Sequence, residues 1–174
     1  MKSPASCVVL VGPPGAGKST VGALLAAAMN WAFLDTDILI EQQEQRYVAD
    51  IFIEDGEAHF RELEVSAVSQ ALSRQRAVIS LGGGAVLDMR TQQSLAGLPV
   101  VWLQVSVDVA VRRVGMQAAR PLLLGNVRSR FVTLLAERAA IYAAVSTIAV
   151  STDELPPEAI AEQIRTWLEQ QGNL

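Results

Sequence analysis

The chain has few of the residues that build several common kinds of functional site. Its 174 residues include one histidine, His59, and one cysteine, Cys7, which are too few to supply the ligands of a zinc centre. Cys7 stands in a run of apolar residues, so we expect it to be a buried core side chain. A lone cysteine also leaves no internal disulfide, which favours a cytoplasmic location.

Long apolar runs and an excess of positive charge are missing as well. No apolar run is long enough to cross a membrane, and the run at 7–11 is too short for a signal peptide. The formal net charge of −4 argues against a general nucleic-acid-binding surface. We therefore expect a monomer that forms one domain over residues 1–174 and acts on a small molecule, without a nucleic-acid or membrane partner.

Lysine occurs only twice, as Lys2 and Lys18, because every other basic side chain is an arginine. Lys18 belongs to the stretch Gly12–Thr20, GPPGAGKST, which fits the phosphate-binding P-loop pattern G-x-x-x-x-G-K-[ST]. An ammonium kept at this one interior position is explained more readily by phosphate than by solubility.

The neighbours of this motif are those that a P-loop requires. The apolar run at 7–11 is typical of a buried parallel strand, and residues 21–29 favour a helix that stops at Asn30. Between such a strand and helix, backbone N–H groups and the helix N-terminus point at phosphate oxygens. Lys18 then reaches the β- and γ-phosphates, and Ser19 offers its hydroxyl to Mg²⁺. We expect ATP phosphates to be bound by Gly15, Ala16, Gly17, Lys18, Ser19 and Thr20.

Strand-like and helix-like segments alternate along the chain, which predicts an α/β fold with a parallel sheet. The helical insertion at about 36–75 is a candidate site for the phosphate acceptor. The segment at about 115–126 carries Arg120 between two glycines, which suggests either a mobile lid or a plain surface loop. The last helix should begin near Pro157. Strands are expected at 7–11, at 32–34 with Asp35 at the end, and at 77–81, 100–103 and 147–150.

Two acidic residues, Asp35 and Asp37, directly follow the second expected strand. Ligands of open parallel sheets bind beyond the carboxyl ends of the strands, so both carboxylates should lie near the phosphates. Asp35 could hold a water bound to Mg²⁺, and Asp37 could take the proton of an acceptor hydroxyl. Aspartate is also a common helix N-cap, and the spacing leaves that role for Asp37 equally open.

The third expected strand ends in Gly82, Gly83 and Gly84 and not in an acid. Three glycines allow the backbone to approach a ligand closely, although they also suit a flexible turn. The guanine-binding pattern Asn-Lys-x-Asp of regulatory GTPases is missing. Arg61 stands four residues after Glu57, and such a pair is also common on a solvated helix face.

Taken together, these stretches resemble shikimate kinase. The resemblance covers about residues 5–155 in unbroken order. It implies a three-layer α/β/α P-loop kinase sandwich with five parallel strands in the order 2-3-1-4-5. It also implies transfer of phosphate from ATP to the 3-hydroxyl of shikimate, in the pathway to chorismate and aromatic amino acids. The resemblance rests on the P-loop, Asp35-Thr36-Asp37, Ile51-Phe52, Gly56-Glu57, Phe60-Arg61-x-x-Glu64, the three glycines, Arg120-Pro121-Leu122-Leu123 and Glu137-Arg138 with Tyr142.

The resemblance also implies roles for single residues. Asp37 would contact acceptor hydroxyls, Arg61 and Arg138 would hold the carboxylate, and Gly82–Gly84 would line the acceptor site. Arg120 would close over the transferring phosphate, so that the catalytic residues would be Lys18, Asp37 and Arg120, while Arg113 would stack near adenine. The segment 151–156 departs from the family, because it holds no basic residue where an arginine often stands beside the adenine.

Two other functions fit part of the pattern. A kinase for another hydroxy acid, such as gluconate, would share the P-loop and a carboxylate site. A nucleotide-binding regulatory domain without catalysis would need the P-loop alone. The combination of Phe60-Arg61 with three glycines favours shikimate. A silent domain is disfavoured because the sequence holds Lys18, Ser19, Asp35, Asp37 and Arg120.

Overall fold

The computed structural model describes residues 7–117 and 124–172 and contains a five-stranded parallel sheet. The strand order is β2-β3-β1-β4-β5, which confirms the order that the resemblance implied. Each strand lies within one or two residues of its expected position. The strands are β1 (Cys7–Val11), β2 (Ala32–Asp35), β3 (Ala77–Ser80), β4 (Val100–Gln104) and β5 (Ile148–Ser151).

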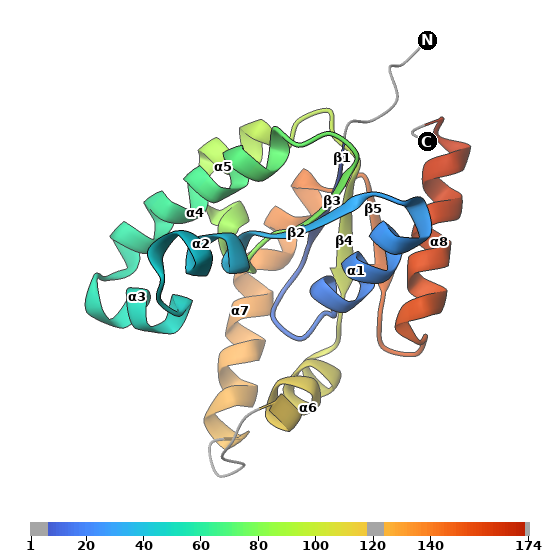
Figure 1. The fold of residues 1–174 in the computed structure, drawn as a ribbon. Helices are drawn as coiled ribbons and strands as arrows, with labels where there is room; N and C mark the ends of the chain where they lie inside the picture. Colours follow the sequence, from blue (N-terminus) through green and yellow to red (C-terminus); the bar gives the residue numbers. More distant parts are fainter. Residues whose placement is uncertain (1–6, 118–123, 173–174) are drawn as a thin grey trace.

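Helices cover both faces of this sheet, as the three-layer prediction requires (Figure 1). On one face lie α1 and α8, which pack against each other, and on the other lie α4 and α5. The helices are α1 (Lys18–Met29), α2 (Thr36–Glu44), α3 (Val48–Glu54), α4 (Glu57–Leu72), α5 (Met89–Ser94), α6 (Val107–Gln117), α7 (Leu124–Val145) and α8 (Pro157–Gln170), with a 3₁₀ turn η1 (Ala85–Leu87).

The central strand β1 is apolar throughout because both of its faces are buried. Side chains alternate along a strand, so Val8 and Leu10 join the core cluster with α1 and α8. Val9 and Val11 point the other way, into the cluster with α4 and α7. Cys7 belongs to this second cluster and is fully buried, which confirms its expected core role.

The turn from β1 into α1 needs glycine at its first position. Gly12 has a φ of 149°, and a Cβ there would lie 2.5 Å from the backbone oxygen of Leu103. The helix that follows begins at Lys18, three residues earlier than expected, and its C-cap is Asn30 in the left-handed conformation. The predicted helix stop is therefore confirmed.

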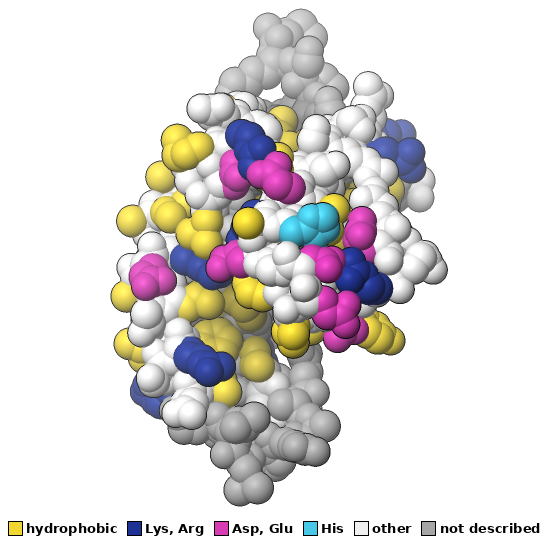
Figure 2. Space-filling view, turned by 90° about the vertical axis from the view of Figure 1, so that its left-hand side faces the viewer, with side chains coloured by type: hydrophobic (Ala, Val, Ile, Leu, Met, Phe, Trp, Pro, Cys, Tyr) yellow, Lys and Arg dark blue, Asp and Glu magenta, His cyan; other side chains and the backbone are white. Residues whose placement is uncertain are grey.

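The stretch between β2 and β3 folds into α2, α3 and α4, which extend from one edge of the sheet (Figure 1). These helices share a small core of their own, made by Ile40, Ile51, Phe60 and Ala67. On the face seen in Figure 2, acidic and basic side chains are interspersed. One such group joins Arg46 to Glu44, Glu54 and Asp55 on the exposed side of these helices.

Some features differ from the expectations or extend them. The short elements η1 and α5 were not predicted. Arg120 and half of the proposed lid fall in 118–123, outside the residues that the structure describes. Within the described ranges, no helix combines the length and apolar character that a membrane crossing requires.

Candidate active site

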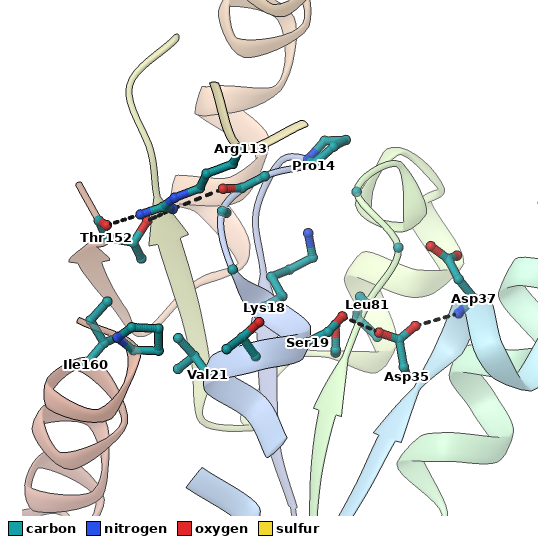
Figure 3. A pocket seen from close by; sticks show the side chains of 18 of the residues that line it. Pro14, Lys18, Ser19, Val21, Asp35, Asp37, Leu81, Arg113, Thr152 and Ile160 are labelled. Carbon is teal, nitrogen blue, oxygen red and sulfur yellow. Dashed lines mark hydrogen bonds between the residues drawn. The ribbon is translucent and has the colours of Figure 1, made fainter. Parts of the chain in front are cut away.

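A cavity of about 740 Å³ opens at the carboxyl ends of β1, β2 and β3 (Figure 3). Its walls come from the P-loop and the start of α1, from Asp35 at the end of β2 and Asp37 in the first turn of α2, and from the end of β3 with the segment that follows it. These groups are far apart in sequence and meet because β2, β3 and β1 are neighbours in the sheet. The lining includes residues 14–21, Asp35, Asp37, residues 80–83, Arg113, Met116, Thr152, Leu155, Pro157 and Ile160.

The ammonium of Lys18 is held by the P-loop itself. Its Nζ donates hydrogen bonds to the carbonyl oxygens of Gly12 (2.8 Å) and Pro13 (3.0 Å). Burial lowers the pKa of Lys18 to about 8, and the negative charges of Asp37 and Asp35 oppose that decrease. The charge of Lys18 therefore lies within electrostatic reach of both aspartates.

Asp35 is the N-cap of α2, so the capping role considered for Asp37 is wrong. Asp35 Oδ1 accepts hydrogen bonds from the backbone N–H groups of Asp37 (3.0 Å) and Ile38 (3.5 Å). Its other oxygen, Oδ2, accepts from Ser19 Oγ at 2.7 Å. The backbone of Asp35, at the end of β2, has the extended conformation that is typical of an N-cap, whereas Asp37 already lies in the first helical turn. Asp35 thus joins the start of α2 to the start of α1.

Asp37 is left with a carboxylate that takes no part in capping and faces the cavity (Figure 3). Burial raises its pKa, as does the neighbouring charge of Asp35, while Lys18 and Arg61 act in the opposite direction. The buried Thr36 fixes the position of this turn relative to β3. Its Oγ1 accepts from the N–H of Gly82 (3.0 Å) and donates to the carbonyl of Ser80 (3.4 Å).

Each of the three glycines after β3 has a different functional neighbour. A Cβ on Gly82 would lie 2.6 Å from Asp37 Oδ1 and 2.9 Å from Glu64 Oε1. One on Gly84 would lie 2.6 Å from Nη1 of Arg61. One on Gly83 would lie 3.1 Å from the Pro14 ring in the P-loop. A side chain on Gly82 or Gly84 would therefore displace the Asp37 and Glu64 carboxylates or the Arg61 guanidinium, and one on Gly83 would crowd the P-loop.

Arg61 is anchored by a buried carboxylate that the sequence reasoning did not assign to the site. Its Nη1 donates to Glu64 Oε2 at 2.6 Å, and Nη2 donates to Glu57 Oε1 at 3.3 Å. Glu64 is 2% exposed, and burial raises its pKa while the hydrogen bond from Arg61 opposes the rise. The spacing of three residues on one helix was visible in the sequence, but not that this helix face turns inward.

Arg138 on α7 lies within electrostatic reach of the same buried carboxylate. Its charge acts on the pKa of Glu64, and it also contributes to the lowered pKa of Lys18. The structure thus brings Arg61 and Arg138 near one buried carboxylate, next to the glycine segment. Neither arginine lines the 740 Å³ cavity itself.

Arg113 connects the P-loop to the segment after β5. Its Nη1 donates to the Gly15 carbonyl and to Thr152 Oγ1, each at 3.0 Å, and Nη2 donates to the Thr152 carbonyl (Figure 3). The resemblance implied a place near adenine for Arg113, whereas Thr152, which is 1% exposed, was not assigned to the site. Where the family often presents an arginine, the cavity is lined by Leu155, which is 46% exposed.

The fold and this site together define a P-loop nucleotide-dependent kinase, since a phosphate-binding loop and acidic side chains share one cavity. A family model described as shikimate kinase matches residues 14–169. A shikimate kinase from Thermobifida fusca (strain YX) is 49% identical over 165 residues, which is 95% of this chain and 96% of that protein. The chain belongs to the shikimate kinase family.

Solved structures agree with this assignment. The shikimate kinase from Acinetobacter baumannii, in complex with shikimate, has a TM-score of 0.89 at 31% identity, over 96% of this chain and 94% of that one. A gluconokinase from Sinorhizobium meliloti 1021 has a TM-score of 0.64 at 20% identity, over 96% and 93% of the two chains. That second likeness is one of fold alone.

Proposed function

We propose that the protein transfers the γ-phosphate of ATP to the 3-hydroxyl of shikimate. The observation that carries the proposal is that Asp37 lines the P-loop cavity and also lies close to the Arg61–Glu64 pair. A Cβ on Gly82 would lie 2.6 Å from Asp37 Oδ1 and 2.9 Å from Glu64 Oε1, the carboxylate that accepts from Arg61. A phosphate site and a site for an anionic acceptor therefore adjoin at one carboxylate, as transfer between two bound substrates requires.

On the phosphate side, the N–H groups of residues 15–20 and the N-terminus of α1 bind the oxygens of ATP. Lys18 exchanges its bonds to the Gly12 and Pro13 carbonyls for bonds to the β- and γ-phosphates. Arg113, held by Thr152 and Gly15, lies beside the base together with Leu155.

Mg²⁺ belongs to the same proposal, and the donor chemistry fits it. The Ser19 hydroxyl and the Asp35 carboxylate lie 2.7 Å apart at the cavity wall, and hard divalent cations prefer oxygen ligands. Ser19 would bind the ion directly and Asp35 through a water molecule. The bound ion would neutralise negative charge on the phosphate oxygens.

On the acceptor side, Asp37 accepts the proton of the attacking hydroxyl, and Arg61 and Arg138 bind the carboxylate of shikimate. Arginine suits this task because its planar fork meets both carboxylate oxygens. Gly82–Gly84 line the acceptor site between the side chains of Asp37 and Arg61. The role of Arg120 at the transferring phosphate stays a prediction from the sequence, as do the cytoplasmic location and the monomeric state.

The test is ADP release with a panel of hydroxy acids that includes shikimate and gluconate, with ³¹P NMR of the product to locate the phosphate. We expect shikimate to be strongly preferred and phosphorylated at its 3-hydroxyl. A preference for gluconate would assign the chain to another acceptor. ATP binding without ADP release for any acceptor would leave a silent nucleotide-binding domain. The Lys18→Ala protein serves as the control for contaminating kinases.

A further inference from the structure

The glycine segment Gly82–Gly84 is held by hydrogen bonds from two directions. Thr36 Oγ1 accepts from the N–H of Gly82 at 3.0 Å. From α7, the hydroxyl of Tyr142 donates to the carbonyl oxygen of Gly83 at 2.6 Å. Tyr142 is fully buried, and the chemistry proposed above gives it no part. The hydrogen bond therefore links a buried phenol on α7 to the backbone of the proposed acceptor site.

The bond to Tyr142 determines more than the position of one oxygen. The carbonyl of Gly83 and the N–H of Gly84 belong to a single planar peptide group, and in a trans peptide they point in opposite directions. A bond that fixes the carbonyl on the phenol therefore directs the Gly84 N–H away from the core in which Tyr142 lies. Within residues 7–117 and 124–172, the N–H groups of Gly83 and Gly84 donate to no protein acceptor.

The surroundings place this N–H among the groups proposed to bind the acceptor. The Arg61 guanidinium lies directly beside Gly84, where a Cβ would be 2.6 Å from Nη1. Arg138 stands one helical turn before Tyr142 on α7. Burial raises the pKa of Tyr142 against the opposing effect of Arg138, so the phenol keeps its proton and remains a donor at neutral pH.

Because residues 83 and 84 are both glycine, the orientation of the peptide group between them depends on its hydrogen bonds. Glycine has no Cβ to restrict its dihedral angles, so the peptide group between Gly83 and Gly84 has little preference of its own for one orientation. A hydrogen bond to its carbonyl restricts the group and also polarises it, which makes the N–H a better donor.

We propose that Tyr142 is a positioning residue that holds the Gly83–Gly84 peptide group so that the Gly84 N–H is presented as a hydrogen-bond donor to the acceptor substrate. The inference rests on the proposed function, because the donor is assigned to shikimate. The acceptor loses a well-directed donor when the phenol hydroxyl is removed, while the phosphate site on the P-loop keeps all of its own groups.

The kinetic test compares Tyr142→Phe with Tyr47→Phe. Tyr47 is the only other tyrosine and is 71% exposed, so its variant removes the same atom without touching the site. We expect Tyr142→Phe to raise the KM for shikimate roughly 3- to 10-fold, the range of one neutral hydrogen bond, with kcat changed by less than about twofold. The KM for ATP should stay at the wild-type value in both variants.

An NMR measurement tests the peptide group directly. Gly82–Gly83 and Gly83–Gly84 are the only adjacent glycine pairs among the 12 glycines, so protein labelled with [1-¹³C,¹⁵N]glycine gives two HNCO peaks. In Tyr142→Phe we expect the peak that carries the Gly83 carbonyl to move in its ¹³C dimension. In wild type, saturating shikimate should move the Gly84 amide proton of that same peak, and in Tyr142→Phe this response should shrink.

Three results would overturn the proposal. They are a Gly84 amide that does not respond to shikimate in wild type, a Tyr142→Phe enzyme with the wild-type KM for shikimate, and an equal rise of the KM for ATP. The first of these needs no variant, so it decides even if Tyr142→Phe fails to fold. Failure of the proposed function is a separate outcome, since wild type would then release no ADP with shikimate.

Discussion

At the scale of single residues, Lys18 combines a required charge with an environment that disfavours it. Burial lowers the pKa of its ammonium to about 8, although two carbonyls accept its hydrogen bonds and two aspartates lie within electrostatic reach. Without phosphate, this buried charge destabilises the folded protein. The lysine is therefore explained by what it binds and not by what it adds to stability.

We predict that Lys18→Met stabilises the ligand-free protein at pH 7 and that this gain shrinks at alkaline pH. The pKa of Lys18 is lower in the folded than in the unfolded chain, so the unfolded state binds more protons between about pH 8 and 10.5. Raising the pH through this window thus stabilises wild type relative to the variant, by about 3 kcal/mol at most. Urea unfolding of both proteins from pH 7 to 10 measures it, and a difference independent of pH would contradict the prediction.

Asp35 and Asp37 stand two residues apart but have different surroundings, so substitutions at the two positions should have different effects on activity and on stability. Asp37→Asn keeps the shape but removes the proton acceptor, and we expect kcat to fall on the order of 10²–10⁴-fold. Because burial raises the pKa of Asp37, its charge disfavours folding at neutral pH, and the variant should be at least as stable as wild type. Initial rates and thermal unfolding provide the two measurements.

The matched comparison is Asp35→Ala, which removes the helix cap. That variant should lose about 1 kcal/mol of stability, a typical value for an N-cap, together with activity. If Asp37→Asn were the less stable of the two, or kept full activity, the division of roles between these aspartates would be incorrect.

At the scale of elements, α4 and α7 each contribute one arginine to the proposed acceptor site. Arg61 on α4 is held by Glu64 at 2.6 Å, and Arg138 on α7 acts on that same carboxylate through its charge. Neither helix alone can bind a carboxylate from two sides. The relative position of the two helices is therefore part of the specificity.

We predict that Arg61→Lys and Arg138→Lys each reduce kcat/KM for shikimate roughly 10- to 150-fold, because a charge-assisted bidentate contact contributes about 1.5–3 kcal/mol. Both arginines would hold the same ligand group, so the loss in the double variant should be smaller than the sum of the two. Steady-state kinetics of the three variants measure these values. ATP affinity without acceptor should not change.

The methyl ester of shikimate is the control for this clamp. Wild type should discriminate against the ester, and the arginine variants should discriminate less. Equal use of acid and ester by wild type would show that no carboxylate clamp exists. Loss of ATP affinity in the variants would instead assign these arginines to the phosphate site.

The elements differ in how far their sequence reveals them. β1 and the P-loop carry their own signals, because a run buried on both faces is apolar throughout and the loop needs glycine. η1 and α5 were missed because they are too short to show a periodic pattern, and Leu87 and Met89 are exposed apolar residues that point to no core. The roles of Thr152 and Tyr142 depend on hydrogen bonds to Arg113 and to Gly83, which are dozens of residues away in the sequence. No local sequence pattern indicates such contacts.

At the scale of the whole molecule, the strand order brings the site together. β3 lies between β2 and β1, with Asp35 paired to Ser80 and Leu10 paired to Ser80 in the register. The acidic pair, the glycine segment and the P-loop therefore leave the sheet side by side at one end. The strands themselves were predicted from their composition, but their order came from the resemblance, since nothing in an apolar strand specifies its neighbour.

This arrangement predicts that the two substrates stabilise the protein independently, through different walls of the site. A ligand at 100 times its Kd adds about 2.7 kcal/mol to the free energy of unfolding, which raises the Tm of a chain this long by roughly 5–10 °C. We expect shikimate and ATP each to produce such an increase. Lys18→Ala should lose the increase with ATP and keep that with shikimate, whereas Arg138→Lys should show the reverse. Differential scanning fluorimetry with each ligand measures the four values. If both variants lost both responses, the phosphate and acceptor groups would form one inseparable site, and the assignment of Asp37 to the boundary between them would be wrong.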